Sequence, residues 1–524
     1  MAKFVSVEEA VSHIKDGDTM AVNGMMMVGA CRPFYPALEK RFLETGSPKN
    51  LTMFSSCGIG HTMSTSPDIP PDMVNRLAHP GMVKRIITSH IQSFVGFLPA
   101  IIKNELEAYI IPQGTVAEML HSAAHRAVGT FTRVGLKTHA DPRYQGGALN
   151  ECSKDQLCRL ATFDGKEYLF YPNIYPDVCL IRGSTADING NITFEREAAI
   201  YDPLATAQAT KNNGGIVIVQ VGRFNGGFAK AQDVKIPGRL VDYIYVDSDQ
   251  MQTTGEVYNG IYSGEIRAPK DMMDSVMTAD AKTDMNRPMA DKVITRRAAL
   301  ELKKGDIINL GIGLPSIIGM QAIDMNVVNL DDISFTIELG IFGGIPAGSS
   351  AFGATVNPEA MYDQAAQFEY YEGGGLDIAF TGALEVDQHG NVNVVRHGDK
   401  IIGVGGFNYV TSTPKTVVFC TKFMSKSGYQ RDENGKPVPF DGGAKKLVAD
   451  AEYINFNGEV ATENGQRVLY ITERCVFELK GGKMTITEVS PYVDLQKDIL
   501  DQLSFQPEVS SDLKEMPAIC FEVE

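Results

Sequence analysis

Two segments of the chain carry the same succession of structural signals, and this repeat limits the fold more than any other feature. Residues 6–24, SVEEAVSHIKDGDTMAVNG, start with a helix-capping serine, Ser6, and continue through an apolar helical face, a Gly-Asp turn and an apolar strand to Gly24. Residues 293–313, VITRRAALELKKGDIINLGIG, repeat the helix, the Gly-Asp turn and the strand, which reaches Gly311. The order of elements predicts two related domains.

A second pair of matching motifs follows in the same order. TADINGNITF (185–194) and EVDQHGNVNV (385–394) each place D-x-x-G-N between two extended runs. This spacing is typical of a hairpin loop with glycine in the left-handed conformation. An apolar strand comes after each motif, at 214–221 and at 415–423. Two matches in the same order indicate duplication of one ancestral domain.

The fold class follows from the alternation of elements within each half. Short β-branched runs alternate with helical patterns such as 115–127 and 359–368, which favours an α/β fold with a mostly parallel sheet. A chain of 524 residues is also too long for one ordinary core. We therefore predict two tandem, related, open α/β domains, 1–270 and 291–524, joined by a polar, Met-rich linker at 271–290.

Composition narrows the partners and the compartment. The formal net charge of -16 argues against nucleic acid as a main partner, although backbone donors can still bind a polyanionic ligand. The N-terminal residues lack the apolar core of a signal peptide, and no apolar run reaches membrane-spanning length. The eight cysteines are scattered without a C-x-x-C pair, so we expect reduced thiols and a cytoplasmic protein.

One carboxylate, Glu338, follows an apolar strand in SFTIELGIFGGIPAG (334–348) and precedes a glycine-rich loop. No cation lies within this stretch, and an isolated ionised carboxylate is costly to bury. A structural carboxylate bound by loop amides fits the pattern. So does a general base or a covalent nucleophile, beside glycine amides that can approach an oxyanion. The residues alone leave both interpretations open.

Two further segments could supply donors. Gln113, in YIIPQGTVAEML, lies just before a helix expected to begin at Thr115, and its amide could donate to a substrate oxygen. A G-x-G-G-F cluster, with Gly403, Gly405 and Gly406, follows an apolar pair and could supply one amide donor and room for a pantetheine arm. A solvent-facing turn and a β-bulge are the simpler interpretations of these segments.

The remaining patterns are weaker. In IINLGIGLPSIIG (307–319), Gly311 and Gly313 follow a strand in a turn that could cradle a phosphate, yet neither a Walker A motif nor a complete GxGxxG is present. A tight strand-to-helix turn fits the pattern at least as well. His121 and His125 have the i,i+4 spacing of zinc ligands, but no third ligand is evident from the sequence, so no metal is expected.

Beyond these motifs, the chain resembles the family I CoA-transferases along nearly its whole length. The likeness is greatest to single-chain acetate and propionate CoA-transferases, whose two domains correspond to the separate α and β subunits of relatives. It rests on long stretches: KRFLETGSPKNLT (40–52), KEYLFYP (166–172), IRGSTADINGNITFE (181–195), FGGIPAGSSAFGA (342–354), FEYYEGGGLDIAFTG (368–382) and YITERCVFEL (470–479). The fold implied is of the NagB/RpiA/CoA-transferase-like type.

The resemblance implies roles for the residues named above. The family's catalytic glutamate falls on Glu338, although Leu339 replaces the usual Asn or Ser after it. The glutamine of the P-Q-G-T signature, which helps to form the oxyanion hole, falls on Gln113, and Gly405 resembles the second donor. Residues that resemble the family's CoA contacts are Gly311, Ile312, Gly313, Leu314, Pro315, Gly403 and Gly406.

The first domain departs from the family pattern at one loop. In VNGMMMVGACRP (22–33), methionines replace the glycines and the phenylalanine of a G-x-G-G-F loop. Met25, Met26 and Met27 could line the acyl pocket, because methionine is pliable, or they could pack in the core. Both possibilities stay open.

The activity implied is transfer of CoA between a short-chain acyl-CoA and a free carboxylic acid. The resemblance implies ping-pong chemistry through a glutamyl-CoA thioester, with CoA as a substrate, no prosthetic group and a homotetrameric assembly. The expected partners are acyl-CoA and small carboxylic acids. Two alternatives remain: an acyl-CoA thioesterase on the same scaffold, and a non-catalytic regulatory module that binds CoA or a sugar phosphate.

Overall fold

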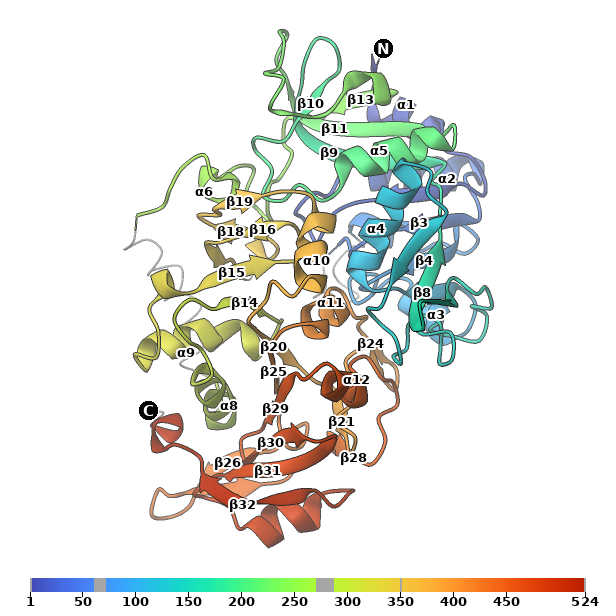
Figure 1. The fold of residues 1–524 in the computed structure, drawn as a ribbon. Coiled ribbons are helices and arrows are strands. Elements are labelled where there is room, and N and C mark those ends of the chain that lie inside the picture. Colours follow the sequence, from blue (N-terminus) through green and yellow to red (C-terminus); the bar gives the residue numbers. More distant parts are fainter. Residues whose placement is uncertain (1, 61–71, 270–286, 349–350, 523–524) are drawn as a thin grey trace. The chain divides into compact units, whose positions relative to one another are not determined.

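A computed structural model of the chain describes residues 2–60, 72–269, 287–348 and 351–522 (Figure 1). The chain divides into two compact units. Unit 1 comprises Met1–Ala268, Ile337–Glu369 and Ile401–Gly406, and unit 2 comprises Pro269–Thr336, Tyr370–Lys400 and Phe407–Glu524. Residues 271–286 of the predicted linker lie outside the described residues, and the predicted domain boundaries stay a prediction. Segment 337–369, which carries Glu338, belongs to the unit of the N-terminal half.

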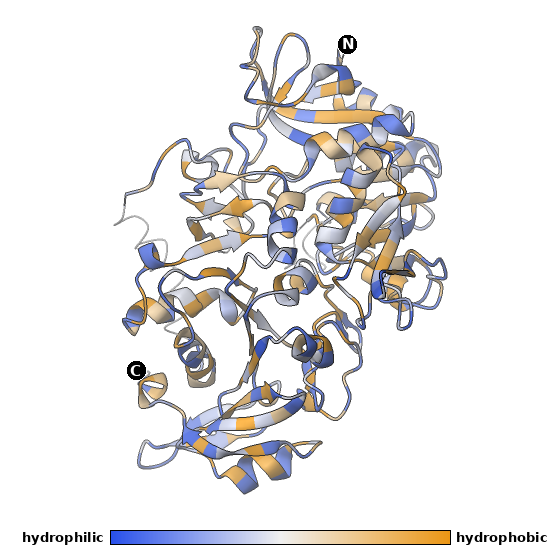
Figure 2. Ribbon diagram, in the orientation of Figure 1, coloured by the Kyte–Doolittle hydropathy of each residue, from blue (hydrophilic) through white to orange (hydrophobic). Residues whose placement is uncertain are grey.

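Unit 1 is built on a parallel sheet, as the alternation of elements predicts. Every adjacent pair along its strand order is parallel. All nine residues of the central strand β9 are buried, which is expected where both faces of a parallel sheet are covered. Hydrophobic residues run along β11 in Figure 2. The order is β1 (Lys3–Phe4), β13 (Tyr243–Val246), β11 (Ile216–Phe224), β9 (Val178–Ala186), β2 (Thr19–Val22), β3 (Leu51–Phe54), β4 (Val83–Thr88) and β5 (Glu107–Ile110).

Helices connect these strands, and α4 and α5 pack side by side (Figure 1). The helices are α1 (Val7–Ser12), α2 (Phe34–Thr45), α3 (Leu98–Ile102), α4 (Gln113–Ala124), α5 (Pro203–Asn212) and α6 (Gly260–Ser263), and α10 (Gln364–Glu372) begins in this unit. Shorter strands are β6 (Gly129–Thr132), β7 (Arg159–Phe163), β8 (Lys166–Pro172), β10 (Ile192–Thr193), β12 (Val234–Ile236), β16 (Ile341–Phe342), β17 (Ile345–Pro346), β18 (Thr355–Val356) and β19 (Ala360–Met361).

The sheet of unit 2 is mixed. Its first five strands are parallel, and the pairs that β30 makes with β29 and β31 are antiparallel. The order is β15 (Ser334–Ile337), β14 (Ile307–Leu310), β20 (Ile378–Gly382), β25 (Thr416–Cys420), β29 (Arg467–Ile471), β30 (Cys475–Lys480), β31 (Lys483–Val489) and β32 (Glu508–Glu515). Among the described residues, the α-helices beside it include α8 (Met289–Ala299), α9 (Ile318–Asp324), α11 (Phe407–Ser412) and α12 (Gly458–Glu463). Short strands are β21 (Glu385–Asp387), β22 (Val392–Asn393), β23 (Arg396–His397), β24 (Lys400–Ile401, at the unit boundary), β26 (Gly428–Arg431), β27 (Pro437–Phe440) and β28 (Leu447–Val448).

The Gly-Asp turns of the sequence repeat have the same hydrogen bond in both units, whereas α8 lacks the side-chain cap of α1. In the Gly-Asp turns, the Lys15 N–H donates to Asp18 Oδ2 and the Lys303 N–H donates to Asp306 Oδ2, each at 2.8 Å. In α1, the Ser6 hydroxyl accepts from the backbone of the first turn, so the predicted N-cap is confirmed. The two halves therefore use the same turn hydrogen bond at the same position of the repeat, where their sequences resemble each other.

The D-x-x-G-N motifs form the predicted hairpin loops. Asp187 joins β9 to β10, and Asp387 joins β21 to β22; both strand pairs are antiparallel. One oxygen of each aspartate accepts two backbone N–H groups of its loop at 2.8–2.9 Å. Gly190 and Gly390 have φ values of 77° and 74°, a left-handed conformation that favours glycine.

Two predicted helices have different bounds. The helix expected over 115–127 begins at Gln113, because Pro112 has the extended ψ of 137° and the chain turns into the helix directly after it. The helix expected over 359–368 is wrong at its start: Ala360–Met361 pairs with β16 as strand β19, and α10 spans Gln364–Glu372. Tertiary pairing here overrides local helix propensity.

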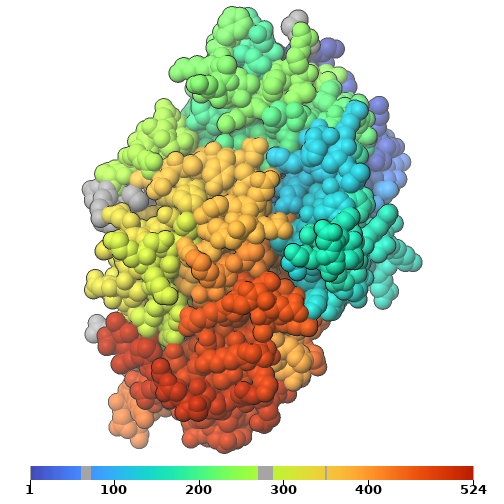
Figure 3. Space-filling view, in the orientation of Figure 1, coloured from blue at the N-terminus to red at the C-terminus, as the bar shows by residue number. Residues whose placement is uncertain are grey.

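Side chains fill the spaces between the ribbons, as the space-filling view of the same orientation shows (Figure 3). All eight cysteines are free thiols; seven are buried and Cys152 is half-buried, in agreement with the prediction of reduced, mainly core residues. Within the described ranges, no helix has the length and apolar character needed to cross a membrane.

Candidate active site

Glu338 lies in a tight turn at the end of β15. The Gly340 N–H donates to the Ile337 carbonyl at 3.2 Å, which closes the turn. Gly340 has φ 86°, and a Cβ added there would lie 1.9 Å from the Tyr362 carbonyl oxygen, so only glycine fits. Glu338 is half-buried and Leu339 is buried. The predicted position of Glu338 directly after a strand is confirmed.

The glycine cluster lies against this carboxylate. A Cβ added at Gly406 would lie 2.5 Å from Glu338 Cγ and 3.1 Å from Glu338 Oε1, so the Gly406 backbone approaches the acid with no side chain between them. The Gly405 N–H donates to the Ser89 carbonyl at 2.9 Å, and a Cβ at Gly403 would lie 2.7 Å from the same oxygen. The Gly405 amide is thus occupied, and it could serve an oxyanion only by giving up the bond to Ser89.

Gln113 reaches the same place from the first residue of α4. Its backbone N–H donates to the Gly405 carbonyl at 3.0 Å. Its side-chain Nε2 donates to Gln364 Oε1 at 3.2 Å, and Gln364 Nε2 donates to Ser56 Oγ at 2.8 Å. All three polar side chains of this relay are buried. The relay holds the Gln113 amide in one orientation, and no sequence motif had indicated Gln364 or Ser56.

A buried thiol, Cys57, also lies near the acid. Burial raises the pKa of the Cys57 thiol to about 12; the Gly58 N–H opposes this rise, and the negative charge of Glu338 adds to it. The thiol is therefore neutral at physiological pH and does not compete with Glu338 as a nucleophile. Sequence reasoning treated the eight cysteines alike, because scattered cysteines have no spacing signal.

The methionine loop is held in place by a buried arginine. Arg182 on β9 forms an ion pair with Glu197 at 2.6 Å, and its Nη1 donates to the Met27 carbonyl at 3.1 Å. Met27 is buried, whereas Met25 and Met26 are half-buried. Core packing therefore explains Met27.

Met25 extends toward the residue next to the candidate nucleophile. A Cβ added at Gly353 would lie 3.5 Å from Leu339 Cδ1, 3.6 Å from Val28 Cγ2 and 3.7 Å from the Met25 sulfur. Three apolar side chains therefore meet around Gly353, and one of them belongs to Leu339, which follows Glu338 in the sequence. This cluster could line an acyl pocket.

The predicted CoA turn, residues 311–315, belongs to unit 2. The Gly311 N–H donates to the Phe380 carbonyl at 2.8 Å, and Gly313 has φ 90°. Ile312 is 63% exposed, so its apolar side chain is open to a ligand. Pro315 opens a short 3₁₀ helix that leads into α9, so the predicted strand-to-helix turn is confirmed as a structure.

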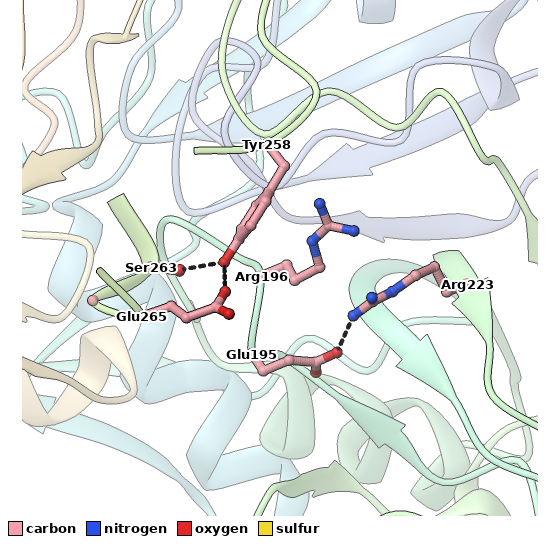
Figure 4. Close-up of a pocket in the computed structure, with 7 residues that line it drawn as sticks. Glu195, Arg196, Arg223, Tyr258, Ser263 and Glu265 are labelled. Carbon is pink, nitrogen blue, oxygen red and sulfur yellow. Dashed lines mark hydrogen bonds and ion pairs between the residues drawn. The ribbon is translucent and has the colours of Figure 1, made fainter. Parts of the chain in front are cut away.

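A cavity of about 630 Å³ in unit 1 has a different lining (Figure 4). The Arg196 guanidinium lies 3.7 Å from the centroid of the Tyr258 ring, and Arg223 forms an ion pair with Glu195 at 2.9 Å. The Tyr258 hydroxyl donates to the Glu265 carboxylate. Two arginines and two glutamates balance in charge, and no predicted site residue lines this cavity. Both of its glutamates are already paired, Glu195 with Arg223 and Glu265 with Tyr258.

The chain is similar to known proteins along most of its length. The family model described as Coenzyme A transferase matches residues 4–247 and 292–497. The chain belongs to the Coenzyme A transferase family. It is a CoA-transferase enzyme, and CoA is a substrate of this family.

Several known proteins align with this CoA-transferase over almost its whole length. The caffeate CoA-transferase of Acetobacterium woodii is 40% identical over 530 residues, covering 99% of this chain and 98% of that protein. The acetate CoA-transferase YdiF of Escherichia coli (strain K12) is 38% identical over 517 residues, covering 98% and 94%. The crystal structure of the acyl-CoA transferase YdiF of E. coli O157:H7, a thioester complex with CoA, matches with a TM-score of 0.89 at 35% identity and covers 99% of this chain and 96% of that one. The predicted family and the two-domain α/β fold are confirmed.

Proposed function

We propose that this CoA-transferase moves CoA from a short-chain acyl-CoA to a free carboxylic acid through a covalent thioester on Glu338. One observation carries the proposal: Glu338, Gln113 and the Gly405–Gly406 dipeptide come from three distant parts of the sequence and meet in one unit. A carboxylate beside a fixed amide donor and an unobstructed glycine backbone is what acyl transfer needs.

The first half-reaction begins when a Glu338 carboxylate oxygen attacks the thioester carbonyl. One N–H of the Gln113 amide is engaged by Gln364, and the other donates to the oxyanion. The Gly406 N–H is the second donor, because the Gly405 N–H already binds Ser89. Collapse expels CoA thiolate and leaves an acyl-glutamyl anhydride. The thiolate then attacks the glutamyl carbonyl, which releases the first acid and forms the glutamyl-CoA thioester.

The second half-reaction reverses these steps with another acid. The acceptor carboxylate attacks the glutamyl thioester, the anhydride re-forms, and the released thiolate takes up the new acyl group. The thioester bond is conserved, so no ATP and no metal is needed in this scheme. Water must be kept from the anhydride, and the apolar side chains around Gly353 support that role.

The proposed acceptors are short-chain acids. The two similar proteins are named for caffeate, an aromatic acid, and for acetate. The short-chain class rests on the acetate named for one of these proteins, and Met25 and Leu339, the residue after Glu338, both approach Gly353 with apolar side chains. Initial rates with these three acceptors and with caffeate decide between the classes; faster transfer to caffeate would overturn the short-chain assignment.

The turn at residues 311–315 supports a contact with CoA. Ile312 offers an exposed apolar side chain to a pantetheine arm, and Gly313 leaves open space beside its Cα. We expect Ile312→Ser to raise KM for the acyl-CoA and to leave kcat unchanged. The inferred homotetramer is checked by light scattering during size-exclusion chromatography.

The decisive experiment traps the covalent intermediate. The protein is incubated with acetyl-CoA without an acceptor, and its peptides are mapped by mass spectrometry. A CoA adduct is expected on the peptide that contains Glu338, absent in Glu338→Gln and present in the control Glu359→Gln, which changes an exposed glutamate of the same segment. An adduct elsewhere, or normal transfer by Glu338→Gln, would disprove the role of Glu338.

Steady-state kinetics separate the thioesterase alternative. A transferase gives parallel lines in double-reciprocal plots against acyl-CoA at several acceptor concentrations. Release of free CoA without acceptor, as fast as transfer with it, would identify a thioesterase.

A further inference from the structure

Three side chains of unit 1 form a cluster at the other end of α4 from Gln113. His121 lies on α4, Asp202 immediately precedes α5, and Asp363 immediately precedes α10. His121 Nε2 lies 3.0 Å from Asp202 Oδ1. The possible ligand atoms of all three residues lie within 4.8 Å of one another. None of the three side chains has a part in the mechanism above, although Asp363 directly precedes Gln364 of the relay.

One oxygen of this cluster is buried without a partner. The Asp202 side chain is 0% exposed, and its Oδ1 accepts from His121 and from the Ala365 N–H at 3.1 Å. Its Oδ2 is fully buried and has no hydrogen-bond partner. A buried carboxylate oxygen is normally satisfied by a donor or by a metal ion. This orphaned oxygen is an observation independent of the grouping of the three side chains.

The ionisable side chains of the cluster act on one another. Burial and the negative charge of Asp202 raise the pKa of Asp363 to about 6, although His121 and Lys235 oppose the rise. Burial lowers the pKa of His121, but Asp202, Asp363 and Glu369 outweigh it and raise that pKa above its ordinary value. The carboxylates of Asp202 and Asp363 therefore lie near the His121 imidazole, and the Glu369 carboxylate is close enough to raise the His121 pKa.

We propose that His121, Asp202 and Asp363 bind a divalent first-row transition-metal ion of the Zn²⁺ or Mn²⁺ type. An imidazole nitrogen with two carboxylate oxygens suits these ions, whereas Mg²⁺ and Ca²⁺ prefer oxygen ligands alone. Ligands about 2.1 Å from a tetrahedral ion lie about 3.4 Å apart. The spread of up to 4.8 Å therefore requires a small inward rotation, for which half-buried Asp363 has the freedom.

The ion would fasten three elements at one point. It would join α4 to the starts of α5 and α10, while the Ala365 N–H already ties α10 to Asp202. No sequence pattern indicates this set, because its members are separated by more than 80 residues. His125, the predicted partner of His121, is exposed, and its Nδ1 lies 2.7 Å from the His121 carbonyl oxygen.

Metal titration of the full-length protein tests the proposal. After treatment with EDTA, the protein is titrated with Mn²⁺ followed by electron paramagnetic resonance, and with Zn²⁺ in a calorimeter. Mn²⁺ is included because the eight free thiols can bind Zn²⁺ but have little affinity for Mn²⁺. We expect one Mn²⁺ per chain, displaced by Zn²⁺ and not by an equal concentration of Mg²⁺.

Matched variants assign the ion to the cluster. Asp363→Asn removes one ligand and relieves the repulsion from Asp202, so it should keep the fold and weaken Mn²⁺ binding at least tenfold. His125→Gln, on the same helix and outside the cluster, should bind as the parent does. Circular dichroism establishes that both variants are folded. Failure of the parent to bind one equivalent, or undiminished binding by folded Asp363→Asn, would overturn the proposal and would identify the cluster as an ordinary Asp–His ion pair.

Discussion

Replacing Gly406 by alanine is the sharpest test of the proposed active-site geometry. The glycine does not have a positive φ, so alanine can adopt its backbone conformation. The new Cβ would lie 2.5 Å from Glu338 Cγ, against an ordinary contact distance of at least 3.4 Å. Glu338 must therefore move by about 1 Å, and a displacement of that size costs roughly 100-fold in rate, or about 2.7 kcal/mol of transition-state stabilisation.

The assay measures transfer from acetyl-CoA to propionate at saturating concentrations, with the new acyl-CoA separated by chromatography. Gly227→Ala is the matched control, because a Cβ there meets no atom within 4 Å. We expect kcat to fall for Gly406→Ala alone, with the thermal unfolding midpoints of both variants close to that of the parent. A kcat within threefold of the parent for folded Gly406→Ala would refute the claim that Glu338 must occupy this position against the Gly406 backbone.

Three further outcomes are expected. Gln364→Leu removes the acceptor that orients the Gln113 amide, so kcat should fall about tenfold with KM unchanged. The control Gln367→Leu, on the same helix, should leave kcat near normal. Equal kinetics in the two variants would contradict the relay. Asp187→Ala and Asp387→Ala each leave two loop N–H groups without their acceptor, so each should lower the free energy of unfolding by about 2 kcal/mol or more. Clearly unequal losses, measured by urea unfolding, would argue against equivalent turns. Burial raises the pKa of Asp187, but hydrogen bonds from Asn191, Ala229 and Asn189 outweigh it and hold that pKa below 3.8, so this stabilisation is present above pH 3.8 and is lost as the pH falls through the native pKa. Finally, iodoacetamide at pH 8 should modify half-buried Cys152 and leave Cys57 intact, because burial is the main cause that raises the Cys57 pKa to about 12. Equal alkylation of the two cysteines, measured by peptide mass, would contradict this prediction.

Within each half, local sequence was enough to place several elements. The strand over Thr19–Val22, the N-cap at Ser6 and the two D-x-x-G-N hairpins are as predicted. Each depends on side chains and backbone groups a few residues apart, so the sequence contains the whole interaction. The prediction failed at 359–368, where pairing of β19 with β16 replaces the first turn of the expected helix. That pairing joins residues that no local pattern relates.

By itself the sequence determined the α/β class, the duplication and the position of Glu338 at a strand end, because periodicity and turn chemistry are local properties. Only the tertiary structure decided what surrounds that carboxylate. Gln113 and Gln364 are 251 residues apart in the sequence and share a hydrogen bond. Gly406 packs against Glu338, although the glycine-rich loop and α10 separate the two residues in the sequence. The cluster of His121, Asp202 and Asp363 arose in the same way. A site assembled from strand ends and helix starts has no spacing in the sequence, since its geometry exists only when the sheet has formed.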